Sequence, residues 1–166
     1  FDPDRPRCRW AGAGAAKPDL AMVRYHDEEW GTPCHDDDEL FERLVLESFQ
    51  AGLSWSTILH KRAAFRAAFR GFDPTLVAAF DDADRARLMA DAGIVRNRAK
   101  IDATIDNARG WLAIAAEHGT VDRYFLSFVP DAGRVLEPVV DVGGIPDRTP
   151  ASDALSADLR KRGFRF

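Results

Sequence analysis

The recurring start and stop signals of helices constrain the fold of this chain more than any other feature. Capping side chains precede apolar residues at helical spacing, and glycines close most of the runs. The pattern predicts helices over residues 36–51, 54–71, 73–80, 82–92, 97–119, 121–129 and 149–163. No segment has the alternation of a half-buried strand, and no internal repeat is present in the sequence. We therefore predict an all-α fold, a single-domain helical bundle.

The remaining stretch, residues 130–149, is predicted to be a loop because it is rich in proline and glycine. A length of 166 residues suffices for one substantial core, so one domain over residues 1–166 is expected. No apolar run is long enough to cross a bilayer, and the first residues lack the apolar core of a signal peptide. These features predict a cytoplasmic protein without a membrane partner.

The charge distribution leaves a nucleic-acid partner open. The net charge of −4 argues weakly against phosphate binding, which usually requires a basic surplus. Basic residues nevertheless gather in two stretches, Arg85, Arg87, Arg96, Arg98, Lys100 and Arg109, and Arg160, Lys161, Arg162 and Arg165. On charge alone, solvated helix surfaces with interleaved Asp and Arg are a better interpretation than one basic face.

Residues 88–101 combine a helix end, a glycine turn at Gly93 and a second helix that begins with Arg96, Arg98 and Lys100. The backbone N–H groups of such a turn can bind a phosphate, assisted by the helix dipole and by nearby basic side chains. This is the logic of a helix-hairpin-helix. An ordinary corner between two helices also requires a glycine, and the turn taken alone favours that simpler interpretation.

A second unusual cluster joins aromatic residues to one carboxylate. Glu47 falls at the edge of the apolar stripe of its predicted helix, where a carboxylate needs a partner. The chain reverses just beyond it, so that Trp55 can converge on the same concave site. An aromatic wall with a hydrogen-bond acceptor suits a planar cationic ligand, such as an alkylated purine. The alternative is an aromatic cluster that only fills the core, made of Trp10, Tyr25, Trp30 and Trp55.

Five separated motifs carry a more specific signal. They are Arg7-Cys8-x-Trp10, Tyr25-His26-Asp27-x-Glu29-Trp30-Gly31-x-Pro33, Leu46-Glu47-x-x-Gln50-Ala51-Gly52-Leu53-Ser54-Trp55, Ala92-Gly93-Ile94-x-Arg96-x-Arg98-x-Lys100-Ile101, and Ala151-Ser152-Asp153-Ala154-Leu155-Ser156 with Lys161-Arg162-Gly163-Phe164. Together they resemble the 3-methyladenine DNA glycosylase I family, in the right order and over essentially the whole chain. The resemblance implies a helix-hairpin-helix DNA glycosylase that flips 3-methyladenine out of alkylated double-stranded DNA and hydrolyses its N-glycosidic bond.

The resemblance also implies how the base is recognised. Glu47, the predicted catalytic-site residue, would accept hydrogen bonds from the extruded base, while Tyr25 and Trp55 stack on it. The rest of the base-binding wall would be formed by Trp30, Trp10 and Gln50. Methylation at N3 already makes the base a good leaving group, so selective binding is expected to matter more than acid catalysis. Water would be the nucleophile and free 3-methyladenine the product, without a lyase step.

For the DNA itself, the resemblance implies contacts at two turns. Gly52 and Leu53 would fill the gap left by the flipped nucleotide. The turn at Gly93 would hold the backbone, with phosphate contacts from Arg96, Arg98 and Lys100. The resemblance further implies that the protein acts as a monomer.

Members of this family resemble zinc proteins in which a cysteine and a histidine near the amino end join a histidine and a cysteine near the carboxyl end. Cys8 and His26 match the first pair. The second pair has no counterpart, because the sequence stops at Phe166, where the family continues. None of the remaining candidates has a suitable spacing, namely Cys34, His35, His60 and His118. Structural zinc is thus expected in the complete protein, with two of its four ligands in this chain.

Two other classes of function remain as alternatives. A non-catalytic DNA-binding module would use the turn at Gly93 and would not need Glu47 beside Trp55. A small-molecule binder of alkylated purines would use the pocket, and Arg96 and Arg98 would be dispensable. The resemblance ranks the glycosylase ahead of both.

Overall fold

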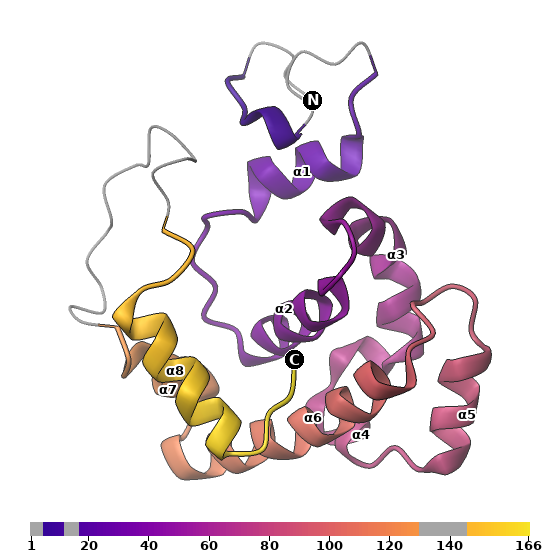
Figure 1. Ribbon diagram of the computed structural model, residues 1–166, viewed down its shortest axis with the longest axis vertical. Helices are drawn as coiled ribbons and strands as arrows, with labels where there is room; N and C mark the ends of the chain where they lie inside the picture. The colour runs from indigo at the N-terminus through magenta and orange to yellow at the C-terminus, as the bar shows by residue number, and fades with distance from the viewer. Residues whose placement is uncertain (1–4, 12–16, 130–145) are drawn as a thin grey trace.

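The computed structural model describes residues 5–11, 17–129 and 146–166, and within these ranges the chain forms helices and no strand. In chain order the elements are η1 (Arg9–Ala11), α1 (Leu20–Glu28), α2 (Asp37–Gln50), α3 (Trp55–Ala68), η2 (Arg70–Phe72), α4 (Pro74–Ala78), α5 (Asp82–Ala90), α6 (Arg98–His118), α7 (Val121–Leu126) and α8 (Pro150–Lys161), as drawn in Figure 1. The predicted all-α fold is confirmed for these ranges.

The predicted helix starts are confirmed by side chains that cap them. The Asp36 carboxylate accepts the Glu39 N–H at 2.9 Å at the start of α2, and the Ser54 hydroxyl caps α3 in the same way. Further N-caps are Asp73 before α4, Asn97 before α6 and Thr149 before α8. Each cap satisfies a backbone N–H that has no partner within its helix.

Several predicted helices were too long at their carboxyl ends: α4 ends at Ala78, α7 at Leu126 and α8 at Lys161, two or three residues before the predicted limits. The second predicted helix was expected to reach Gly71, but α3 ends at Ala68. Arg70, Gly71 and Phe72 follow with φ values of 55°, 70° and 62°, a backbone conformation that breaks an α-helix. The helix α5 similarly ends at Ala90, two residues before the predicted limit.

The sequence pattern missed α1, although a start signal was present. Asp19 follows a proline and accepts the Ala21 N–H at 3.1 Å as the N-cap. Only Val23 of this nine-residue helix is fully buried, so its apolar periodicity is weak. The predicted loop 130–149 lies mostly outside the described residues, and residues 146–149 contain no helix.

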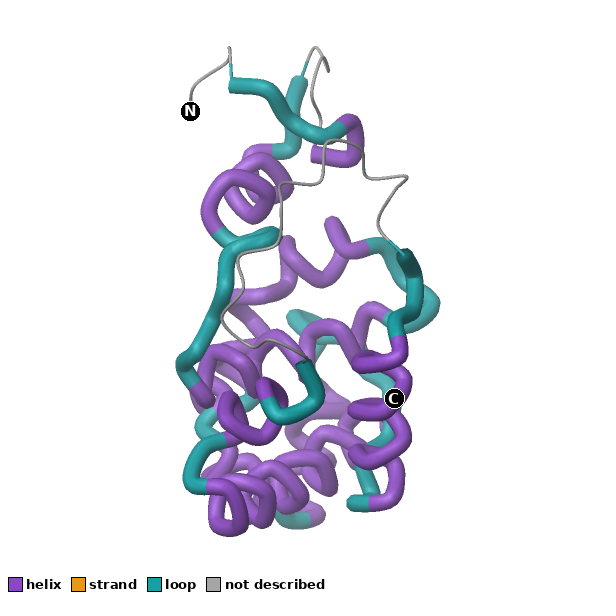
Figure 2. The backbone as a smooth tube through the Cα atoms, turned by 90° about the vertical axis from the view of Figure 1, so that its left-hand side faces the viewer, coloured by secondary structure: helices purple, strands orange, loops and turns teal. Residues whose placement is uncertain are grey.

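The helix α6 organises the core of the described residues. It packs against α2, α4, α5 and α7, and it contributes the fully buried Trp111. A cluster of phenylalanines fills the space between α2, α3 and η2, namely Phe41, Phe49, Phe65, Phe69 and Phe72. In both Figure 1 and Figure 2, α1 lies at one end of an elongated molecule, beyond the helices that enclose this core. Among the described helices, none combines the length and apolar character that a membrane span requires.

Candidate functional site

A cavity of about 170 Å³ lies between α1, α2 and the start of α3. Its lining consists of Tyr25, Glu29, Trp30, Gly31, Arg43, Leu46, Glu47, Trp55 and Arg62. Four of the predicted site residues, Tyr25, Trp30, Glu47 and Trp55, are therefore brought together around one hollow. A mixed aromatic and polar lining of this kind is typical of a ligand pocket.

Glu47 has no hydrogen bond or ion pair with any described residue. Solvent reaches its side chain, yet enough protein surrounds the carboxylate that desolvation raises its pKa above the ordinary value of 4.5. No basic side chain offsets this effect. The cavity therefore contains a carboxylate acceptor that the fold leaves free for a ligand.

Two N–H donors of the cavity lining also lack partners among the residues described. Trp55 Nε1 and Arg43 Nε are both buried and make no hydrogen bond. Buried donors are nearly always paired in folded proteins, so an unpaired donor beside a cavity indicates a polar ligand or water. The site therefore offers both acceptor and donor groups to a planar heterocycle.

The aromatic residues form a continuous group, but not all of them line the cavity. Tyr25 and Trp55 have ring centroids 5.2 Å apart, and Trp10 meets Trp30 edge-on at 5.3 Å. Trp10 contacts Tyr25 and Trp30 and does not line the cavity itself, so it supports the aromatic wall. Gln50 is also absent from the lining. The predicted direct contacts of Trp10 and Gln50 with a base stay a prediction that this cavity does not itself support.

An ion-pair network that was not predicted from the sequence contributes Glu29 and Arg62 to the lining of the same cavity. The guanidinium of Arg62 donates to both carboxylate oxygens of Glu29 at 2.7 Å and also pairs with Glu42. Glu42 is buried and additionally accepts from Arg66 at 2.9 Å. These pairs neutralise the arginines, so that Glu47 keeps its negative charge uncompensated. A spacing signal existed: Arg62 lies two helical turns after Trp55, and Arg43 one turn before Glu47.

Beside the cavity, the turn between α2 and α3 points two of the predicted DNA-binding residues outward. Gly52 has φ of +82°, a conformation that favours glycine, and the Leu53 side chain is 41% exposed. An exposed leucine at the tip of a tight turn can insert into a gap in stacked bases. The predicted exposure of this turn is confirmed.

The turn between α5 and α6 places Gly93 in close packing. A Cβ there would lie 3.0 Å from the Cβ of Ala64 and 2.9 Å from Asp91 Oδ1, which explains the glycine. Arg96 is exposed and forms no hydrogen bond or ion pair with the described residues, while Arg98 pairs with Asp102 at 3.0 Å. Both remain accessible at the start of α6.

Lys100 does not occupy the position expected of a phosphate ligand. Its side chain is only 6% exposed, and Nζ donates to the carbonyls of Phe49 at 2.9 Å and Ala51 at 2.6 Å. Because its ammonium group is already satisfied within the fold, a contact with a DNA phosphate would require Lys100 to leave these carbonyls, and that contact stays a prediction.

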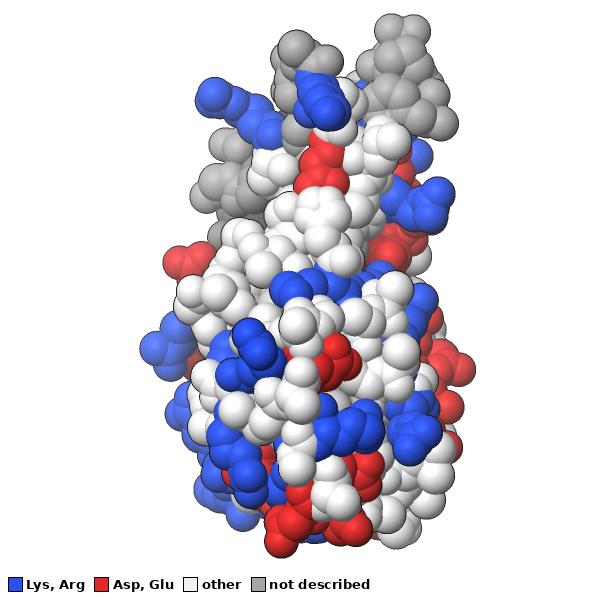
Figure 3. All heavy atoms as spheres, turned by 90° about the vertical axis from the view of Figure 1, so that its right-hand side faces the viewer, with Lys and Arg blue, Asp and Glu red and all other residues white. Residues whose placement is uncertain are grey.

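The face of the molecule shown in Figure 3 carries basic and acidic side chains in alternation, with uncharged surface between them. Among the described residues, ion pairs such as Arg85 with Asp102 and Arg87 with Asp84 also join basic and acidic side chains. The interpretation of interleaved charges therefore fits this face better than one continuous basic face.

Cys8 and His26, the predicted zinc ligands, lie close together near α1. The Cys8 N–H donates to His26 Nε2 at 3.3 Å, and His26 Nδ1 lies 3.0 Å from the Asp27 carboxylate. Two donors are half the number of a closed structural zinc site. Among the residues that the structure describes, no group of three or more potential ligands is placed to hold a metal ion.

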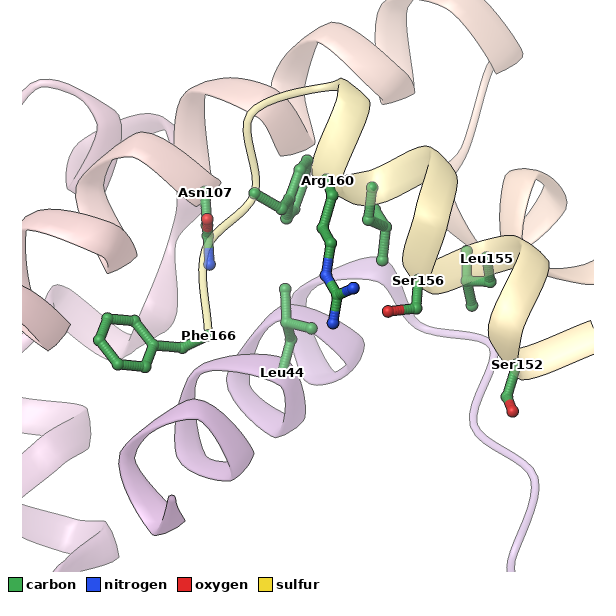
Figure 4. A pocket seen from close by; sticks show the side chains of 9 residues that line it. Leu44, Asn107, Ser152, Leu155, Ser156, Arg160 and Phe166 are labelled. Carbon is green, nitrogen blue, oxygen red and sulfur yellow. The ribbon is translucent and has the colours of Figure 1, made fainter. Parts of the chain in front are cut away.

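A second cavity of about 270 Å³ lies between α8, α2 and the last residues of the chain. Its lining is mainly apolar, and in Figure 4 Arg160 of α8 extends into the space toward Leu44 of α2. Asn107 holds the neighbouring segment by accepting the Arg165 N–H at 2.9 Å. This cavity contains no carboxylate and none of the predicted site residues.

Comparison with known proteins assigns the chain to a family. A family model described as methyladenine glycosylase matches residues 15–166. DNA-3-methyladenine glycosylase 1 of Escherichia coli (strain K12) is 45% identical over 160 residues, which are 96% of this chain and 82% of that protein. DNA-3-methyladenine glycosylase of Haemophilus influenzae (strain ATCC 51907 / DSM 11121 / KW20 / Rd) is 40% identical over 96% of this chain and 83% of its own length.

Solved structures agree with the sequence comparison. A crystal structure of 3-methyladenine DNA glycosylase I superposes with a TM-score of 0.86 at 44% identity, covering 96% of this chain and 85% of that one. A structure of the Staphylococcus aureus enzyme, described as the structural basis of its 3-methyladenine recognition, superposes with a TM-score of 0.85 at 34% identity. It covers 94% of this chain and 81% of that one. The family model and these relatives span nearly all of the described helices, and the chain belongs to the methyladenine glycosylase family.

Proposed function

We propose that this protein is a DNA repair glycosylase that excises 3-methyladenine from alkylated double-stranded DNA by hydrolysing the N-glycosidic bond. The observation that carries the proposal is the unpaired carboxylate of Glu47 in a cavity lined by Tyr25, Trp30 and Trp55. The family supports it, because its relatives are named for this activity.

Recognition of the base would supply most of the catalysis. Methylation at N3 gives the adenine a positive charge in DNA, and the free carboxylate of Glu47 would attract that charge and accept hydrogen bonds from the exocyclic amine. Tyr25 and Trp55 would stack on the ring, and Trp30 would close the aromatic wall. These interactions favour a cationic purine over an unmodified neutral base.

Hydrolysis would proceed by departure of the base and addition of water to the sugar. The N-glycosidic bond breaks with its electron pair going to the base, which leaves as neutral 3-methyladenine. Water then bonds to C1′ and loses a proton to solvent. No lysine lines the cavity among the described residues, and this supports a monofunctional enzyme without a Schiff-base step.

DNA would be held at the two turns beside the cavity. We assign α5, the turn at Gly93 and α6 to a helix-hairpin-helix that binds the phosphate backbone, with Arg96 and Arg98 as its basic side chains. The exposed Leu53 would fill the gap left by the flipped nucleotide. One monomer carries all of these elements, so a monomer would act on duplex DNA.

Cys8 and His26 would supply two ligands of a structural zinc site, whose other ligands are not among the described residues. When bound, zinc would cross-link the segment before α1 to another part of the protein. Metal analysis of the purified protein and thermal unfolding with and without chelator test this proposal. We expect the purified protein to contain zinc, and Cys8→Ser to lose the zinc and to have a lower Tm. A protein that contains no metal and whose Tm does not change with chelator would contradict the proposal.

The function is tested by measuring the bases released from methylated duplex DNA. Wild type should release 3-methyladenine, and Glu47→Gln should lower the rate by about 10- to 100-fold, the loss of one charged hydrogen bond. Arg96→Ala should weaken DNA binding and leave the rate at saturating DNA intact. Glu28→Gln is the matched control, because Glu28 is an exposed glutamate on the neighbouring α1.

The outcomes separate the alternatives. A folded protein that binds duplex DNA and releases no base is a DNA-binding module. A protein that binds free 3-methyladenine, does not bind DNA and keeps its affinity for the free base in Arg96→Ala is a small-molecule binder. Either result would overturn the glycosylase proposal.

A further inference from the structure

Lys100 is a buried ammonium without an acidic partner among the described residues. It lies in the first turn of α6, and its Nζ donates only to two backbone carbonyls, those of Phe49 and Ala51. Burial lowers its pKa, with desolvation as the cause. A buried lysine is costly unless its hydrogen bonds are made, so these carbonyls are essential partners.

The two carbonyls lie at the carboxyl end of α2, where backbone acceptors lack helical partners and the helix dipole is negative. The same end of α2 carries Glu47 in its last turn. Directly beyond it, the chain turns through Gly52 and Leu53, where the Leu53 N–H donates to the Gln50 carbonyl at 2.6 Å. Lys100 therefore fixes the segment that joins the cavity carboxylate to the exposed leucine.

A second lysine makes the reciprocal contact. Lys61 of α3 donates to the carbonyls of Ala92 at 3.2 Å and Gly93 at 3.0 Å, in the turn between α5 and α6. The α2–α3 pair thus contributes Lys61 to the turn between α5 and α6, and α6 contributes Lys100 to the turn between α2 and α3. Ammonium–carbonyl contacts thus link the segment with Leu53 and the turn with Gly93 to neighbouring helices, in addition to the packing of Gly93 against Ala64.

We propose that Lys100 is a positioning residue for base extrusion: its ammonium group couples the turn at Gly93, which holds the DNA backbone, to the turn at Leu53, which enters the duplex. This role rests on the proposed glycosylase function. When the backbone is held at one turn, Lys100 transmits that position to Leu53, so that the leucine meets the gap and the base reaches Glu47. Loss of the contact would misplace Leu53, the wedge that enters the duplex, without removing any group that touches the base.

The decisive variant is Lys100→Met, which keeps the length and most of the volume and removes the donors. The fold is checked by circular dichroism, and four quantities are then measured: the affinity for free 3-methyladenine, the affinity for a duplex with an abasic-site analogue, the single-turnover rate of base release, and the fluorescence of a 2-aminopurine in that duplex. Unstacking of a 2-aminopurine opposite the abasic analogue reports entry of the wedge. Lys161→Met, an exposed lysine at the end of α8, controls for the loss of one positive charge.

We expect Lys100→Met to bind the free base and the duplex as wild type does. Base release should fall by about 10²-fold, the effect of a misplacement of roughly 1 Å, and the 2-aminopurine signal should fall with it. In a double-mutant cycle, Lys100→Met should add little to Leu53→Ala, because both act on the same step. Lys61→Met should instead weaken duplex binding.

Three results would overturn the proposal: base release at the wild-type rate, equal losses in all four measured quantities, or additive effects of Lys100→Met and Leu53→Ala. If Lys100→Met does not fold, Lys100→Gln replaces it, because an amide can still donate to one carbonyl. Failure of the glycosylase function itself is distinct, since wild type would then release no 3-methyladenine while the 2-aminopurine signal could still depend on Lys100.

Discussion

The ring of Tyr25 on α1 lies 5.2 Å from the ring of Trp55 at the start of α3, with the two planes inclined by 55°. A flat base between two parallel rings needs roughly 7 Å, which is two carbon–carbon contact distances. The two rings are therefore too close to sandwich a base as they stand. A base that stacks between them beside Glu47 requires one of the rings to move or rotate.

This geometry predicts that binding of 3-methyladenine changes the environment of Trp55. Titration with the free base should alter the tryptophan fluorescence of the protein, and Trp55→Phe should lose most of that change. Trp111→Phe serves as the control, because Trp111 is buried in the core. A ligand-induced change that persists in Trp55→Phe would show that the base stacks elsewhere.

The raised pKa of Glu47 predicts an acidic limb in the pH profile of base release. Only the ionised carboxylate attracts the cationic base, so kcat/KM should fall as the pH drops through the pKa of the free protein, at a pH above the ordinary glutamate value of 4.5. In Glu47→Gln the residual activity should lack this limb. An unchanged limb in that variant would assign the titration to another group.

The same pKa shift has a consequence for stability. Because the pKa is higher in the folded state than in the unfolded state, the folded protein binds more protons between the two values and loses stability as the pH rises through them. Above the folded pKa, ionised Glu47 destabilises the fold. Glu47→Gln should therefore have an equal or higher Tm at pH 7 and no such advantage at pH 3, which thermal unfolding at the two pH values checks.

The ion-pair network around the buried Glu42 predicts that removing its charge lowers the free energy of unfolding strongly. Glu42 is buried and pairs with Arg62 and Arg66, so Glu42→Gln leaves Arg66 without a charged partner and Arg62 with Glu29 alone. We expect a loss of about 3 kcal/mol in the free energy of unfolding, measured in urea. Glu39→Gln breaks a partly exposed pair with Arg43 and should cost less, about 1 kcal/mol. Similar losses in the two variants would contradict this account.

The packing of Gly110 in α6 against Phe164 predicts that Gly110→Ala changes the free energy of unfolding in opposite directions with and without the Phe164 ring. A Cβ there would lie 2.5 Å from the ring of Phe164, which is buried, so Gly110→Ala should destabilise the protein by about 1–3 kcal/mol through overpacking. In a Phe164→Ala background the clash is absent, and the same substitution should stabilise by about 1 kcal/mol through helix propensity. Two urea-unfolding pairs measure this; destabilisation in both backgrounds would mean that Phe164 is not the cause.

Local sequence signals determined the helices. The starts at Asp36, Ser54, Asp73, Asn97 and Thr149 could be predicted because an N-cap satisfies backbone groups within the next few residues. The end of α3 could not, because Arg70 and Phe72 adopt positive φ only where tertiary packing buries Phe72. The short α1 was missed since most of its residues lack the apolar periodicity that burial produces.

The sequence by itself determined the membership of the site, and the tertiary structure decided its geometry. Tyr25, Trp30, Glu47 and Trp55 were recognisable as motif residues, but only the packing of α1 against α3 and of α2 beside them brings the four to one cavity. The roles of Arg62 and Lys100 were decided by partners on other helices or turns, 20 to 51 residues away along the chain. In the sequence, a lysine after a glycine turn indicates a phosphate ligand. In the fold, Lys100 instead donates to carbonyls at the carboxyl end of α2. Charge and spacing are local properties of the chain, whereas desolvation and hydrogen-bond partners depend on which distant segments fold together.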